Sequence, residues 1–206
     1  MHSWAAAGPD AAQIERATIG RRASNDGACK RLLIVSPHFP PINAPDMQRA
    51  RMSLPYFREF GWEPSVLAVA GRHVEGVVEP ALVDTLPSDV DVTRVDAWST
   101  SWTRRVGVGN LALRAFTHLA RAGWRLIRSR QIDCVYFSTT MFPSMALGRI
   151  WKGWLGTPFV LDIQDPWLST YYDEHPDVAR PPKYAFAHTL DRILEPWTMR
   201  AVDGLT

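Results

Sequence analysis

Short apolar runs alternate along this chain with segments whose apolar residues recur every three to four positions. The first run, 32–35, precedes a Pro-rich bend and then an apolar stripe at helical spacing, formed by Met47, Ala50, Leu54, Phe57 and Phe60. Gly61 and Pro64 end this stripe, and a second apolar run follows at 66–70. A glycine after the last turn and a proline beyond it are typical of a helix end. The pattern therefore predicts a buried strand, a helix and a second buried strand, which together form a βαβ unit.

The same alternation continues to the end of the chain. We expect further strands at 89–95, 133–138 and 159–162, helices at 80–86, 111–129, 143–154 and 184–201, a loop over 165–182, and the start of another strand at 203–206. Pro196 predicts a kink in the last helix or a junction of two shorter ones. This order predicts an α/β, Rossmann-like doubly wound parallel sheet with right-handed crossovers. Residues 1–30 have no periodic apolar stripe and are expected to be a disordered extension.

Composition narrows the class of protein only modestly. The chain has 206 residues, 46 % of them hydrophobic and 21 % charged, which suits one large globular domain. A net charge of +2 neither favours nor excludes an anionic partner. Two cysteines, Cys29 and Cys134, are too few for a disulfide framework and are expected to be free thiols in a reducing compartment. No apolar run approaches the about 20 residues that span a bilayer, so a cytoplasmic protein is expected.

Ligands of open parallel sheets bind where strands end and helices begin, so the loop 37–46 is the first candidate for a site. His38 follows the first strand directly. Its imidazole could face a ligand and exchange a hydrogen bond with it, or could bond a nearby carbonyl. The helix that opens at Asp46 would turn its positive end toward this loop, which favours an anion.

Two separated segments carry a family resemblance. The first comprises VSPHFPP at 35–41, Arg49 and FGWEP at 60–64; the second is GTPFVLDIQDPW at 156–167. In this order they resemble the N-terminal domain of GT-B glycosyltransferases of the family 4 type. The resemblance covers residues 31–206. It implies the N-terminal, acceptor-side half of an enzyme that moves a sugar from a nucleotide-sugar to a lipid-linked or polysaccharide acceptor.

The resemblance also implies a second, donor-binding domain that these 206 residues lack, so the chain alone is expected to be an inactive fragment. The family's first loop usually contains Gly-Gly, which lets backbone amides approach the donor phosphates. This chain has Ile42-Asn43-Ala44-Pro45 there, and Pro45 has no N–H to offer. A non-enzymatic alternative is a binding or membrane-docking module that pairs with a separate donor-domain chain. The resemblance implies neither a metal nor a cofactor.

Several side chains are candidates to bind substrate. Asn43 could use its amide. Arg49 and Arg51 lie on almost opposite sides of one turn, and the resemblance favours Arg49, which matches the family's arginine and could pair with phosphate. Further along, Asp162 and Asp165 could bind sugar hydroxyls, Trp167 could stack on a sugar ring, and Thr139 could hydrogen-bond a sugar. The local alternatives are a solvated arginine, a turn capped by Asp165, and a tryptophan packed on the sheet edge. A glycoside hydrolase with paired carboxylates is disfavoured, because the predicted fold has no matching cleft.

Two other ligand classes find no support. The six histidines show no metal-ligand spacing, and no cysteine pair accompanies them. No G-x-G-x-x-G follows the first strand, which counts against a dinucleotide-binding enzyme.

One stretch of the chain is strongly basic. Between 97 and 132 there is no Asp or Glu, and at about 100° per residue four arginines share one arc of the expected helix. These are Arg114, Arg121, Arg125 and Arg128. The neighbouring apolar arc could pack on the sheet and leave the arginines solvated. Alternatively, the arginines and Trp98, Trp102 and Trp124 could contact an anionic surface at the inner face of the cell membrane. Nucleic-acid binding is not expected, since no reading module is recognisable.

Overall fold

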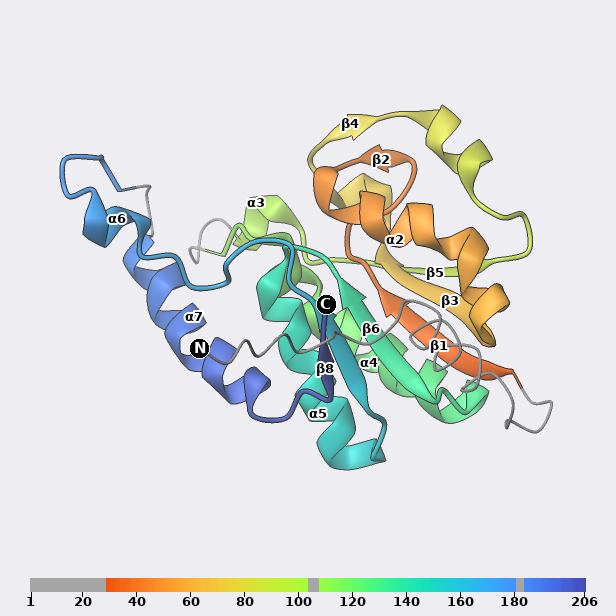
Figure 1. The fold of residues 1–206 in the computed structure, drawn as a ribbon. Coiled ribbons are helices and arrows are strands. Elements are labelled where there is room, and N and C mark those ends of the chain that lie inside the picture. Colours follow the sequence, from red (N-terminus) through yellow and green to blue (C-terminus); the bar gives the residue numbers. More distant parts are fainter. Residues whose placement is uncertain (1–28, 104–107, 181–183) are drawn as a thin grey trace, which may run out of the picture.

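The computed structural model describes residues 29–103, 108–180 and 184–206. Its centre is a parallel six-stranded sheet in the order β5-β3-β1-β6-β7-β8 (Figure 1). The strands are β1 (Lys30–Val35), β3 (Trp62–Val69), β5 (Asp91–Val95), β6 (Cys134–Ser138), β7 (Phe159–Asp162) and β8 (Gly204–Leu205). The expected Rossmann-like α/β class is confirmed, and the segment 203–206 does begin a strand, which pairs parallel with β7.

Helices connect the strands. The α-helices are α2 (Gln48–Ser53), α3 (Thr100–Thr103), α4 (Leu111–Arg130), α5 (Ala146–Leu155), α6 (Tyr171–Glu174) and α7 (Tyr184–Met199). The 3₁₀ helices are η1 (Pro45–Met47), η2 (Leu54–Phe60), η3 (Gly71–His73), η4 (Pro80–Thr85) and η6 (Phe142–Met145). A separate antiparallel pair, β2 (Ile42–Asn43) and β4 (Val77–Val78), lies beside α2.

Both faces of the sheet are buried. Successive side chains of a strand point to opposite faces, so Leu33 and Val35 lie in one core cluster while Leu32 and Ile34 lie in another. The first cluster is covered by α4, α5 and η6, and the second by α2 and η2. This explains why the strands read as continuous apolar runs rather than as alternating ones.

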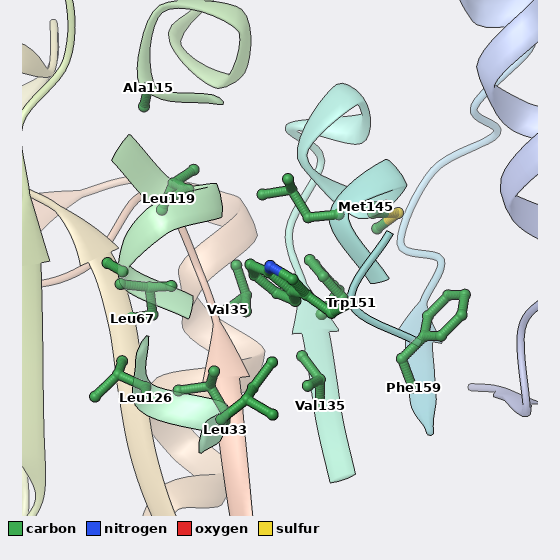
Figure 2. Close-up of a cluster of buried hydrophobic side chains, with 14 of the residues drawn as sticks. Leu33, Val35, Leu67, Ala115, Leu119, Leu126, Val135, Met145, Trp151 and Phe159 are labelled. Carbon is green, nitrogen blue, oxygen red and sulfur yellow. The ribbon is translucent and has the colours of Figure 1, made fainter. Parts of the chain in front are cut away.

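Trp151 of α5 is the largest fully buried side chain. Figure 2 shows it among Val35, Leu119 and Val135, with its ring between the strands and α4. The ring stacks on Phe137 at 5.9 Å between centroids, and it reaches α4 where Gly123 leaves room. The close approach of α4 and α5 therefore depends on a residue without a side chain.

The helix expected over 46–60 is wrong in detail. The structure divides it into η1, α2 and η2. Pro55 lacks an N–H and stands near the start of η2, where the chain tightens into a 3₁₀ helix. The tighter winding rotates the apolar stripe, so Met47, Ala50 and Leu54 are buried while Phe60 is 68 % exposed.

Other differences are local. The segment expected to be a loop over 165–182 contains α6, and α7 runs past Pro196 as one assigned helix to Met199. The pair β2 and β4 was not predicted, because two-residue strands leave no periodic pattern to detect. The expected extension at 1–30 falls mostly on residues 1–28, which lie outside the described residues.

Candidate functional site

A histidine and a carboxylate meet where β1 ends. Nδ1 of His38 lies 2.8 Å from Oδ1 of Asp46, the second residue of η1. Oδ2 of Asp46 accepts hydrogen bonds from the Thr139 hydroxyl at 2.8 Å and from the Thr140 amide at 3.3 Å. Thr139 and Thr140 follow β6, the sheet neighbour of β1. The pair therefore lies at the carboxyl edge of two adjacent parallel strands.

Local backbone contacts hold the His38 loop against the sheet. The Ser36 amide donates to the Leu67 carbonyl at 3.1 Å, and the Pro37 carbonyl accepts from the Val69 amide at 3.0 Å. The Ser36 hydroxyl then donates to the His38 carbonyl at 2.8 Å. These bonds continue the β1–β3 pairing beyond the strand end, so His38 is placed by the sheet itself.

The environment of Asp46 determines which nitrogen of His38 carries the proton. Burial alone would raise the pKa of Asp46, but hydrogen bonding and the charge of His38, with the hydrogen bonds of Thr139 and Thr140, bring the pKa below its usual value. An ionised carboxylate only accepts hydrogen bonds, so Nδ1 of His38 must donate. In neutral His38 the lone pair then lies on Nε2. The His38 side chain is 16 % exposed, so it is not sealed in the core.

A second buried carboxylate lies at the end of β7. Asp162 is fully buried, and its Oδ1 pairs with the guanidinium of Arg49 from α2. Its Oδ2 accepts from the Ser138 hydroxyl at 2.8 Å and from Nε2 of Gln164 at 3.2 Å. The charge is thereby compensated, as a buried ion requires. The Arg49 side chain is 57 % exposed, so its charged head reaches from the buried aspartate toward solvent.

Gln164 joins the two centres. Its Nε2 donates to the Asp46 carbonyl at 3.0 Å, while the same group is 3.2 Å from the Ser138 hydroxyl. One continuous polar network thus runs from His38 to Arg49 across the ends of β1, β6 and β7. It offers one imidazole nitrogen and one guanidinium at the sheet edge, which suits proton transfer beside an anionic group.

The hydrogen-bond network brings together some of the sequence-predicted substrate-binding residues and leaves others out. His38, Arg49, Thr139 and Asp162 are brought together by the network. Asn43 lies on β2, where its amide donates to Glu79 at 2.7 Å and its carbonyl accepts from Gln48 at 3.1 Å. Asp165 is exposed just beyond Gln164. Neither Asn43 nor Asp165 joins the hydrogen bonds of His38 and Asp162.

Two expected substrate contacts are corrected. Thr139 is fully buried and donates its hydroxyl to Asp46, so it positions the carboxylate rather than facing a sugar. Trp167 is only 5 % exposed. Its ring stacks on Phe142 at 5.5 Å, and its Nε1 donates to Asp191 at 2.9 Å. This tryptophan packs in the core and presents no open face for a sugar ring.

Sequence reasoning missed Asp46, Ser138 and Gln164. An aspartate in the first turn of a helix is ordinarily explained by the helix dipole, so Asp46 attracted no separate attention. The feature of the sequence that could have indicated Asp46 is its position eight residues after His38, on the same loop at the same sheet edge. Gln164 stands inside the second motif between the two aspartates, and only the fold shows that its amide reaches back to η1.

The prediction that four arginines of the basic helix face a membrane is wrong for one of them. Arg114 is 3 % exposed, and its guanidinium donates to the Trp98 carbonyl at 3.0 Å and to the His73 carbonyl at 3.1 Å. It is an internal tie between α4 and the preceding loops, so it does not face a membrane. Arg121, Arg125 and Arg128 are exposed, as expected. Two further arginines of the basic stretch 97–132, Arg104 and Arg105, lie outside the described residues.

The described residues contain neither a metal-binding cluster nor a membrane-spanning helix. In residues 29–103, 108–180 and 184–206, no group of three or more His, Cys, Asp or Glu side chains is arranged to hold a metal ion. Over the same ranges, no helix is both long and apolar enough to cross a membrane.

Comparison with known proteins finds solved structures with a similar fold. No family model matches the sequence, and no curated protein matches it either. The chain is similar in structure to Phytolacca americana UGT2 complexed with UDP-2fluoro-glucose and pterostilbene, with a TM-score of 0.50, 14 % identity and coverage of 75 % of this chain. The structure of apo UGT2 from the same plant gives a TM-score of 0.49 at 14 % identity, and the match again covers 75 % of this chain. The likeness shows a Rossmann-type α/β fold. The matched region spans 35 % of that UGT2 chain.

Proposed function

We propose that this chain is the acceptor-side domain of a GT-B glycosyltransferase, in which His38 activates the acceptor hydroxyl. The observation that carries the proposal is the His38–Asp46 pair at the carboxyl edge of the sheet, with Nδ1 bound to a buried carboxylate and Nε2 left as the base. A histidine oriented in this way is suited to general-base catalysis near neutral pH.

The reaction follows from this assignment. An acceptor hydroxyl donates a hydrogen bond to Nε2 of His38 and attacks the anomeric carbon of the donor sugar. The new C–O bond forms as the bond to the nucleotide diphosphate breaks, and the hydroxyl proton passes to Nε2. Asp46 stabilises the resulting imidazolium, and the diphosphate leaves with the bonding electron pair. A single displacement of this kind inverts the anomeric configuration.

Arg49 and Asp162 have a different role in the proposal. Asp162 holds one side of the guanidinium, while more than half of the Arg49 side chain stays exposed. The remaining N–H groups are free to approach a phosphate oxygen, which a guanidinium binds well. We assign Arg49 to the negative charge that develops on the departing diphosphate.

The donor half of the site lies outside these 206 residues in this proposal. It is supported by the match to about a third of a GT-B neighbour and by the two motifs of the family 4 type. We therefore expect a nucleotide-sugar donor bound by further polypeptide and a lipid-linked or polysaccharide acceptor bound on this side. The alternative module, which would pair with a separate donor-domain chain, keeps the same half-site.

The test compares two preparations with a panel of UDP- and GDP-sugars. The first preparation is the 206-residue chain. The second is the longer protein that is encoded when the locus is read past the codon for Thr206. If the reading frame stops at that codon, the second preparation is this chain mixed with the neighbouring donor-domain protein. We expect turnover only in the second preparation and a product of inverted configuration by NMR. Turnover by the 206-residue chain would contradict the division of the site. Retention of configuration would contradict the role of His38 as base.

A further inference from the structure

We propose that the joint outer face of α4 and α5 docks on an anionic phospholipid surface. We call it the Arg–Trp face and define it by Arg121, Arg125, Arg128, Trp124 and Trp154. The inference stands apart from the sugar-transfer proposal, since it uses none of the residues at the ends of β1, β6 and β7.

The charge of this face has one sign. The sequence contains no Asp or Glu between 97 and 132, and none between 134 and 161, so neither α4 nor α5 carries an acidic residue. The three arginines of the face are exposed. Within the described residues they take part in none of the ion pairs found, whereas Arg114, Arg149 and Lys152 of the same two helices bind backbone carbonyls. Unpaired guanidiniums on one surface attract an anionic partner.

Aromatic side chains lie next to these charges. Trp154 of α5 is 76 % exposed, and its ring meets Trp124 of α4 edge-on at 6.4 Å. A groove of about 540 Å³ follows α4 here and is lined by Ala120, Arg121, Trp124 and Arg125. Core packing does not explain an indole that is so widely exposed. Indoles beside cationic side chains are typical of the headgroup level of a bilayer.

A second aromatic pair extends the surface along α4. Trp98 and Trp102 are 51 % and 59 % exposed, and their rings lie 6.2 Å apart. Nε1 of Trp98 donates to the Thr117 hydroxyl at 3.2 Å. Thr117 and Trp124 are two helical turns apart, so about 10 Å separates them along one side of the helix. Arg121 lies between the two aromatic pairs, which fits a flat surface better than a narrow pocket.

The experiment measures flotation of the chain with vesicles of phosphatidylcholine alone and of phosphatidylcholine mixed equally with phosphatidylglycerol. We expect binding to the anionic vesicles only, weakened by salt. Each arginine near an anionic surface contributes about fivefold in partitioning, so Arg121→Gln with Arg125→Gln should reduce binding about thirtyfold. The matched control changes two other exposed arginines, Arg192→Gln in α7 with Arg200→Gln directly after it, and should bind like the wild type.

A second measurement tests the aromatic part. Brominated phosphatidylcholine in the anionic vesicles should quench Trp154, so Trp154→Phe should show less quenching than the wild type. Equal binding to neutral and anionic vesicles, or an arginine double variant that binds like its matched control, would overturn the proposal. So would failure of the wild type to bind vesicles while it binds nucleic acid. None of these readouts depends on sugar transfer.

Discussion

Asp46 is the residue that organises the site. Its two carboxylate oxygens accept from His38, Thr139 and Thr140, which come from two sheet neighbours. Because all three partners donate, the ionised form is favoured and the imidazole is held in one orientation. The Asp46 carboxylate orients the His38 imidazole and can stabilise its protonated form. The hydroxyls of Thr139 and Thr140 cannot replace it, since a hydroxyl is not a proton acceptor near neutral pH.

The lowered pKa of Asp46 predicts a specific pH dependence of stability. The folded-state pKa of Asp46 lies below the ordinary aspartate value of 3.8, so the ionised carboxylate stabilises the fold above that pH. As the pH falls below 3.8 and through the folded-state pKa, this contribution is lost. Asp46→Asn should cost about 1–3 kcal/mol at neutral pH, because its donors then face an amide. The difference from the wild type should shrink in acid.

Urea unfolding at a series of pH values measures this difference directly. Asp165→Asn removes an exposed carboxylate outside the network and serves as the control, with little change expected at any pH. A stability difference between Asp46→Asn and the wild type that stayed constant from neutral pH into the acid range would contradict the assigned ionisation of Asp46.

For single residues, the sequence predicts where a side chain lies in the fold better than it predicts which groups that side chain contacts. His38 and Asp162 were predicted because they lie at strand ends, which depend only on the order of elements, and Arg49 was predicted because it matches the arginine of the resembled family. Their partners depend on side-chain directions across the sheet. Gln164 reaches the carbonyl of Asp46 from another strand end, and no local pattern in the sequence encodes that contact.

Among the elements, the packing of α4 on α5 depends on one glycine. A Cβ at Gly123 would lie 2.2 Å from Cζ2 of Trp151, closer than real Cβ atoms approach any neighbour. Trp151 is fully buried and fixed by Phe137, so it has no room to withdraw. Small residues at such a contact let two helices approach more closely than larger side chains allow.

Gly123→Ala should therefore destabilise the protein although alanine favours helix. Overpacking costs about 1–3 kcal/mol, against a gain of about 1 kcal/mol in helix propensity. Gly153→Ala in α5 is the matched control, because a Cβ there meets nothing within 4 Å. It should raise the free energy of unfolding by about 0.5–1 kcal/mol. Thermal or urea unfolding measures both, and a stabilised Gly123→Ala would contradict the described packing of Trp151.

Segments with one constant period were predicted well, whereas a segment in which the helical winding changes was predicted poorly. The helix at 111–129 and the strands at 133–138 and 159–162 agree with α4, β6 and β7 within a few residues. The segment 46–60 failed because Pro55 changes the winding from 3.6 to 3.0 residues per turn. That change moves Phe60 off the buried side, and an interpretation based on one constant period cannot detect it.

For the whole molecule, strand order decides where chemistry can occur. β1 and β6 are neighbours in the sheet although the sequence between them contains β3 and β5. This reversal of direction at β1 places the ends of β1, β6 and β7 side by side (Figure 1). His38 and Thr139 follow the ends of β1 and β6, and Asp162 is the last residue of β7. In open α/β sheets the crevice at such a reversal is the usual ligand site.

The Arg–Trp face and the His38 network belong to different parts of this arrangement. The network lies at the carboxyl edge of the sheet, whereas the face lies on helices that cover one side of it. A domain that rests on a lipid surface through α4 and α5 would leave the sheet edge free for an acceptor. The two proposals are therefore compatible in space and can be tested separately.

The central claim is that Nε2 of His38 takes the proton of the acceptor hydroxyl. The most direct test is kcat for sugar transfer by His38→Asn in the preparation that contains the donor half. Asparagine can place an N–H near the position of Nδ1, so the bond to Asp46 is kept while the base is removed. We predict a fall in kcat of at least about 100-fold with stability near that of the wild type, and no change for His175→Asn, an exposed histidine after α6. An unchanged kcat in His38→Asn would contradict the account.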